Sequence, residues 1–140
     1  MEQRTINVGL LGSTGTVGQR FIQLLNQHPF LKLTHLGASN RSTHKLYKDA
    51  VNWKLSTPLP LVISNSIVHE CIPENFTSCS IIFSGLDSCV AGQIELDFVK
   101  AGFSYFFPFF LKFNCFILLS SIESCYHLLT INLIHLDLIC

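Results

Sequence analysis

The sequence predicts an α/β fold, a doubly wound parallel sheet that is cut short and followed by an aberrant hydrophobic C-terminal tail. An apolar run leads through a glycine-rich turn into an amphipathic helix, and a second apolar run follows that helix. A further apolar run, "SIIFSG", is again followed by helical spacing. Strands that alternate with helices in this way are typical of a parallel sheet, and 140 residues are enough for one domain with a core.

The first elements form a β-α-β unit. Residues 6–11 are a short apolar run that ends at glycines, as a buried parallel strand does. From Thr16 the apolar residues recur at helical spacing, and Pro29 ends that helix; these residues are Val17, Phe21, Leu24 and Leu25. Residues 30–38 read as the second strand.

The later elements are less regular. Residues 39–59 are polar and predicted to be irregular, and residues 59–64 are predicted to be a short strand. Residues 80–85 favour a buried strand, and residues 90–101 a helix capped by Asp87 or Ser88. A last strand is expected to begin within residues 103–107.

Composition excludes several classes of function. The formal net charge is zero, so neither nucleic acid nor an anionic membrane surface is expected as a partner. The six cysteines form no CxxC pair and no pattern with metal-ligand spacing, so no metal site is predicted. No secretory signal opens the chain, which favours a cytoplasmic location with reduced thiols.

The turn after the first strand has the pattern of a phosphate-binding loop. Gly12 allows a tight turn, Gly15 admits a diphosphate without a Cβ in the way, and Gly18 lets the helix pack closely on the sheet. The helix N-terminus offers free N–H groups, to which Thr14 and Thr16 add hydroxyls. This context predicts a Rossmann-like nucleotide site; the alternative is a glycine-rich turn that serves packing alone.

The end of the second strand indicates which dinucleotide is bound. An NAD site places Asp or Glu here to hold the ribose hydroxyls, but "HLGASNRSTHK" contains no acid. It contains Ser39, Arg41 and Ser42, and a guanidinium beside hydroxyls suits a 2′-phosphate. We therefore expect NADP; the alternative is a solvated surface loop.

Five separated motifs carry a family resemblance. In order, "VGLLGSTGTVGQRF", "LGASNRS", "YKDAVNW", "CIPENF" and "IIFSGLDSCVAGQIE" resemble the N-terminal NADP-binding part of aspartate-semialdehyde dehydrogenase, in the branch found in fungi and archaea. The resemblance covers about residues 5–103 and implies an incomplete NAD(P)-binding domain over residues 1–103. Together with the turn at Gly12, the cofactor-binding residues that it implies are Ser13, Thr14, Gly15, Thr16, Val17, Ser39, Arg41, Ser42, Ser84, Gly85 and Leu86.

The resemblance also implies a reaction. Family members use NADPH to reduce β-aspartyl phosphate to the semialdehyde, on the route to lysine, threonine and methionine. Their cysteine nucleophile and histidine acid/base lie beyond the region of resemblance, so no catalytic residue and no substrate site are assigned here. Cys89, at a helix start, and Cys115, in apolar surroundings, are both interpreted as packed or structural thiols.

The tail, residues 104–140, departs from the family pattern at once. It lacks glycine, is rich in phenylalanine and leucine, and resembles translated T-rich non-coding DNA, which favours a retained intron or a frameshift. A membrane anchor is the competing interpretation, although Pro108, Lys112 and Asn114 interrupt the apolar run. Three outcomes stay open: a catalytically incomplete enzyme fragment, an NADP-binding module that pairs with a second copy or a full-length homologue, and a product that aggregates.

Overall fold

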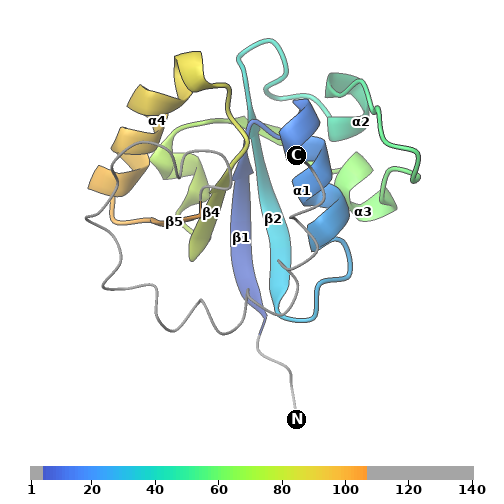
Figure 1. The fold of residues 1–140 in the computed structure, drawn as a ribbon, viewed down its shortest axis with the longest axis horizontal. Helices are drawn as coiled ribbons and strands as arrows, with labels where there is room; N and C mark the ends of the chain where they lie inside the picture. The colour runs from blue at the N-terminus through green and yellow to red at the C-terminus, as the bar shows by residue number, and fades with distance from the viewer. Residues whose placement is uncertain (1–4, 107–140) are drawn as a thin grey trace. The chain divides into compact units, whose positions relative to one another are not determined.

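The computed structural model describes residues 5–106, which form a sheet flanked by helices (Figure 1). The sheet has 5 strands in the order β3-β2-β1-β4-β5, and every neighbouring pair is parallel. The strands are β1 (Ile6–Leu11), β2 (Leu31–Ala38), β3 (Val68–Glu70), β4 (Ile81–Ser84) and β5 (Ser104–Phe106). The predicted parallel sheet is therefore confirmed, and the strand expected after residue 103 is present as β5.

Two long helices cover opposite faces of this sheet. Helix α1 (Thr16–Leu25) connects β1 to β2, and α4 (Ser88–Lys100) connects β4 to β5. Phe21 of α1 stacks on Phe83 of β4 with ring centroids 5.2 Å apart. The neighbouring Ile82 lies in the core cluster that contains Phe98 of α4. Since successive strand side chains point to opposite faces, α1 and α4 lie on different sides, as a doubly wound fold requires.

The face that carries α4 holds an aromatic core. Its fully buried side chains include Leu11, Ile82, Phe76 and Phe98. The rings of Phe76 and Phe98 meet edge to face, with centroids 5.4 Å apart. Burial of large apolar side chains like these is the main favourable term in folding.

The segment between β2 and β4 differs from its prediction in two places. Residues 59–64 are not a strand, because α3 (Leu61–Ser64) begins directly after Pro60 and Ser64 Oγ donates to Leu61 O at 2.9 Å. The strand comes later, as β3, which pairs with the end of β2. The segment expected to be irregular contains the short helix α2 (Tyr47–Ala50), and the 3₁₀ turn η1 (Pro73–Phe76) precedes β4.

Helix α1 buries a face that only partly matches its predicted apolar residues, since Leu25 is buried and Phe21 stacks on Phe83. Val17 and Leu24 are exposed, whereas the buried positions are Gly18, Gln19, Ile22 and Leu25. Counting apolar residues misses this stripe because two of its four members are glycine and glutamine. Asp87 stands at the N-cap of α4 as expected, but its side chain makes no capping hydrogen bond.

The predictions for the tail beyond residue 106 lie outside the described residues. Among residues 5–106, no helix combines the length and apolar character needed to cross a bilayer.

Candidate dinucleotide-binding site

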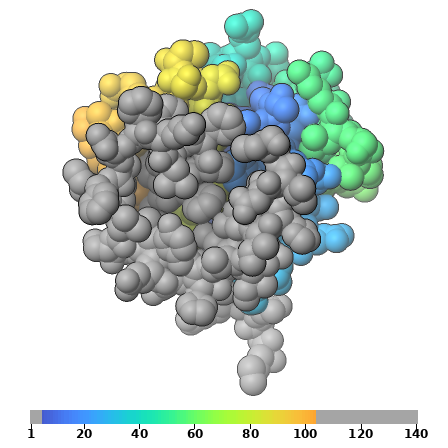
Figure 2. All heavy atoms as spheres, in the orientation of Figure 1, coloured from blue at the N-terminus to red at the C-terminus, as the bar shows by residue number. Residues whose placement is uncertain are grey.

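The carboxyl ends of three strands bring the predicted site residues to one edge of the sheet. The glycine turn follows β1, and the loop with Ser39, Arg41 and Ser42 follows β2. Residues 84–86 lie at the end of β4 and just after it. The loop after β2 lies at the molecular surface, in cyan at the top of the view (Figure 2). Because the strand order reverses at β1, the turns after β1 and β4 flank the point where doubly wound sheets bind ligands.

The turns after β1 and β4 are packed directly together. The Gly85 N–H donates to Leu11 O at 2.8 Å, and the Ser13 N–H donates to Gly37 O of β2 at 2.9 Å. A Cβ on Gly12 would lie 2.6 Å from Gly85 O, and Gly12 has a φ of +70°. Gly12 is therefore required both by its backbone conformation and by the close approach of the two turns.

Gly18 also makes a close contact, but with its own turn. A Cβ there would lie 2.2 Å from Gly12 O and 2.7 Å from Ser13 Cα. The expected packing of Gly18 on the sheet is thus a packing of α1 on the glycine turn that precedes it.

Gly15 differs from both. It is exposed, its φ of −74° suits any residue, and a Cβ would meet nothing closer than Gly12 O at 3.5 Å. Neither conformation nor packing requires glycine at this position. The bare backbone leaves open space in front of the N-terminus of α1, where no side chain caps the helix.

The other residues of the turn divide into inner and outer positions. Ser13 is fully buried, and its Oγ has no hydrogen-bond partner. Thr16 and Val17 are exposed and Thr14 is half-buried. Anions bind at such helix N-termini because the first N–H groups have no partner within the helix.

The loop after β2 presents an exposed cation. Ser39 and Arg41 are exposed and Ser42 is half-buried, and the Ser42 N–H donates to Ser39 O at 2.8 Å in a tight turn. The structure gives Arg41 no ion pair with any carboxylate of residues 5–106. An exposed guanidinium beside two hydroxyls is a suitable phosphate receptor.

The third group, after β4, is held by a residue that the sequence did not indicate. Ser84 is buried, and its hydroxyl donates to Glu95 Oε1 of α4 at 2.7 Å. Leu86 packs against the core cluster. The side chains of Ser84 and Leu86 are thus held by α4 and by the core, and the Ser84 hydroxyl proton is donated to a carboxylate.

Comparison with known proteins assigns the fold to a family. Residues 7–106 match the semialdehyde dehydrogenase NAD binding domain. The chain belongs to this family. It is 55% identical over 93 residues to the aspartate-semialdehyde dehydrogenase of Aspergillus fumigatus, a match that covers 66% of this chain and 26% of the relative. The archaeal enzyme of Methanothermobacter thermautotrophicus is 43% identical over 95 residues, covering 68% of this chain and 27% of the relative.

A solved structure agrees with the family. The aspartate-semialdehyde dehydrogenase of Candida albicans with NADP superposes with a TM-score of 0.72 at 50% identity, covering 74% of this chain and 29% of that one. The chain thus spans little more than a quarter of the length of these relatives, and matches only their nucleotide-binding region. The resemblance predicted from the five motifs is confirmed.

Two residues that support the glycine turn of this semialdehyde dehydrogenase domain were not foreseen. The Tyr47 hydroxyl donates to Ser13 O at 2.7 Å, and Gln19 Nε2 donates to Thr14 O at 3.0 Å. The sequence offered two indications of these supporting residues. Gln19 is a polar residue on the stripe of α1 that the structure shows to be buried, and "YKDAVNW" contains a tyrosine.

Two thiols of the domain, Cys71 and Cys79, are not activated. Burial raises the pKa of Cys71 and of Cys79, which disfavours the nucleophilic thiolate. Cys89 is exposed in the first turn of α4, while Cys115 lies outside the described residues. No group of metal-ligating side chains occurs in the described part of the chain.

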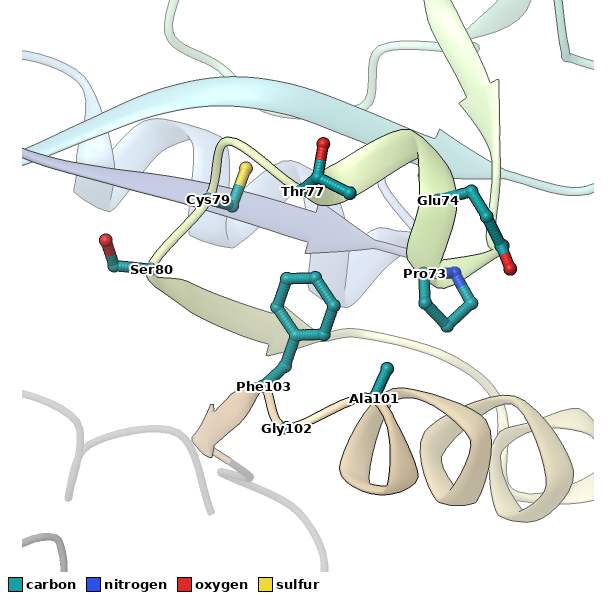
Figure 3. A pocket seen from close by; sticks show the side chains of 8 residues that line it. All are labelled: Pro73, Glu74, Thr77, Cys79, Ser80, Ala101, Gly102 and Phe103. Atoms are coloured by element: carbon teal, nitrogen blue, oxygen red, sulfur yellow. The ribbon is translucent and has the colours of Figure 1, made fainter.

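A hollow of about 540 Å³ lies elsewhere on the domain (Figure 3). It is found where β4 and β5 begin, at the opposite edge of the sheet from the glycine turn. Its lining residues are Pro73, Glu74, Thr77, Cys79, Ser80, Ala101, Gly102 and Phe103. None of the predicted cofactor residues contributes to it.

Proposed function

We propose that this domain binds NADP(H) as the nucleotide-binding half of an aspartate-semialdehyde dehydrogenase. The observation that carries the proposal is Gly15, an exposed glycine that the fold does not need, in front of an uncapped helix N-terminus. An approaching diphosphate explains the missing side chain. The NADP in the related Candida albicans structure supports the same ligand.

Each predicted residue group has a distinct role in this proposal. The turn of residues 12–17 receives the diphosphate, with backbone N–H groups and the hydroxyls of Thr14 and Thr16 as donors. Ser39, Arg41 and Ser42 receive the 2′-phosphate. Ser84, Gly85 and Leu86 line the cofactor from β4. When bound, NADPH supplies the hydride for reduction of the acyl phosphate to the aldehyde.

The reaction itself belongs to the whole enzyme. Relatives reduce β-aspartyl phosphate, but this chain covers only 27% of the length of such a relative. We propose that the 140 residues bind the cofactor without completing catalysis. A cytoplasmic location, and pairing with a second copy or with a full-length homologue, are parts of the same proposal.

Titration with NADP and NAD tests the cofactor assignment. The unmodified chain is expected to bind NADP more tightly than NAD. Arg41→Ala should weaken NADP binding roughly 10- to 100-fold, because a hydrogen bond to a charged group contributes about 1.5–3 kcal/mol. NAD binding should change little. A chain that ignores NADP, or an Arg41→Ala variant that keeps the same preference, contradicts the proposal.

A further inference from the structure

Two buried side chains donate hydrogen bonds to carbonyl groups of the glycine turn. Tyr47 is fully buried, and its hydroxyl donates to the Ser13 carbonyl at 2.7 Å. Gln19, also buried, donates to the Thr14 carbonyl at 3.0 Å. Two consecutive peptide groups of the turn are thereby fixed by side chains that solvent does not reach.

These hydrogen bonds orient the N–H groups of the turn. A trans peptide group is planar, and its C=O and N–H point in opposite directions. The bond from Tyr47 therefore directs the Thr14 N–H away from Tyr47, and no backbone carbonyl of residues 5–106 accepts it. The bond from Gln19 orients the next peptide, whose Gly15 N–H closes the turn onto Gly12 O at 3.1 Å.

Gln19 also ties the turn to a distant segment. Its Nε2 donates to Asn52 O at 2.9 Å, and its Oε1 accepts the Lys54 N–H at 2.8 Å. We name residues 47–54 the bracing segment, since it contains Tyr47 and the two backbone partners of Gln19 that lie outside the turn. With two donated bonds and one accepted bond, the Gln19 amide is engaged at both ends.

The Tyr47 hydroxyl is suited to remain a hydrogen-bond donor. Burial raises the pKa of its phenol, so the hydroxyl keeps its proton over the whole range in which the protein is handled. Removing only that oxygen would leave the Ser13 carbonyl buried without its donor, which costs more than the bond itself contributes.

We infer that Tyr47 and Gln19 are positioning residues, which hold the glycine turn in the conformation that receives the diphosphate. The inference rests on the proposed NADP binding and adds that the bracing segment sets the affinity without touching the ligand. The inference depends on one observation: two buried side chains donate hydrogen bonds to two consecutive carbonyl groups of the turn.

The full 140-residue chain provides the test. Tyr47→Phe should weaken NADP binding about tenfold, the effect of losing one buried hydrogen bond. Gln19→Met removes three hydrogen bonds and should weaken NADP binding by at least as much. The matched control is Gln23→Met, on the same helix, because Gln23 donates to Thr57 Oγ1 at 3.0 Å but contacts no carbonyl of the turn. This control should keep the NADP affinity of the unmodified chain.

A second measurement separates positioning from stability. Amide exchange at Thr14 in the unmodified chain should slow when NADP saturates the site, and in the Tyr47→Phe variant it should be faster before NADP is added. Equal NADP affinity in folded Tyr47→Phe, or an unmodified chain whose Thr14 exchange ignores bound NADP, overturns the inference. An unmodified chain that binds no NADP contradicts the proposed function instead.

Discussion

At the scale of single residues, three glycines of one turn serve three different needs. Gly12 is required by a φ of +70°, and Gly18 by a backbone approach that leaves no room for a Cβ. Gly15 has an ordinary φ and open space around it. The spacing alone makes these glycines look equivalent, and only the contacts around each one show that the fold requires Gly12 and Gly18 but not Gly15.

Alanine substitutions at Gly12 and Gly15 should therefore affect different properties, namely stability at Gly12 and NADP binding at Gly15. Gly12→Ala is expected to lower the free energy of unfolding by at least about 2 kcal/mol, because an L side chain is strained at positive φ and meets Gly85. Gly15→Ala should change it by less than about 1 kcal/mol. Yet Gly15→Ala should weaken NADP binding by about tenfold or more.

Chemical denaturation and NADP titration measure both effects. A Gly15→Ala chain that binds NADP like the unmodified chain would show that this glycine has no role in the site. Ser39→Ala, in the loop after β2, is a comparison variant that should leave the free energy of unfolding nearly unchanged.

At the scale of elements, the connection from α1 to β2 depends on one imidazole. His28 Nδ1 accepts the N–H of Phe30 at 3.2 Å and of Leu31 at 3.0 Å, where β2 begins. Partial burial lowers the pKa of His28 from its ordinary value of 6.5. Both observations favour the neutral ring in the folded state.

The sign of the pH dependence follows. Below about pH 6.5 the unfolded chain binds a proton at His28 more readily than the folded chain does, so the free energy of unfolding falls as pH falls through that window. Well above pH 6.5, His28 is neutral in both states and its contribution to the free energy of unfolding no longer changes with pH. His28→Asn should remove this part of the dependence, because an asparagine Oδ1 accepts similar N–H groups and does not titrate.

Thermal unfolding of both chains between neutral pH and about pH 5 checks this. As the pH falls, the melting temperature of the unmodified chain should fall more than that of His28→Asn. Two curves that stay parallel over this range would show that His28 has no part in acid sensitivity.

At the scale of the whole molecule, the described domain corresponds to only a part of its relatives. The matches to its relatives cover 26–27% of their length, and residues 7–106 match the NAD binding domain. Hydride transfer needs a substrate held against the cofactor, together with a nucleophile and an acid/base group. The buried thiols of Cys71 and Cys79, whose pKa values are raised, do not provide that nucleophile.

The 140-residue chain is therefore expected to show no dehydrogenase activity by itself. NADPH absorbance, followed with aspartate semialdehyde, phosphate and NADP, should stay at the level of the buffer. A full-length aspartate-semialdehyde dehydrogenase in the same assay is the positive control. Turnover by the 140-residue chain would contradict the expectation and require a catalytic group that the described residues do not show.

The sequence by itself determined the β-α-β opening, the glycine turn and the place of Arg41 after an acid-free strand end. These features depend on residues close together in the chain, where apolar period, glycine spacing and capping act locally. It predicted a strand at residues 59–64 where α3 forms, since a short apolar run fits either element until its partners are known.

Only the tertiary structure decided what supports the site. Tyr47 meets the Ser13 carbonyl across 34 residues, and Gln19 meets Asn52 and Lys54 across 33 and 35. Ser84 meets Glu95 across the β4–α4 turn. Polar side chains pair wherever the folded chain brings a donor to an acceptor, and no local pattern records that meeting. For this reason the residues proposed to bind the cofactor were visible in the sequence, while the side chains that hydrogen-bond to the glycine turn were not.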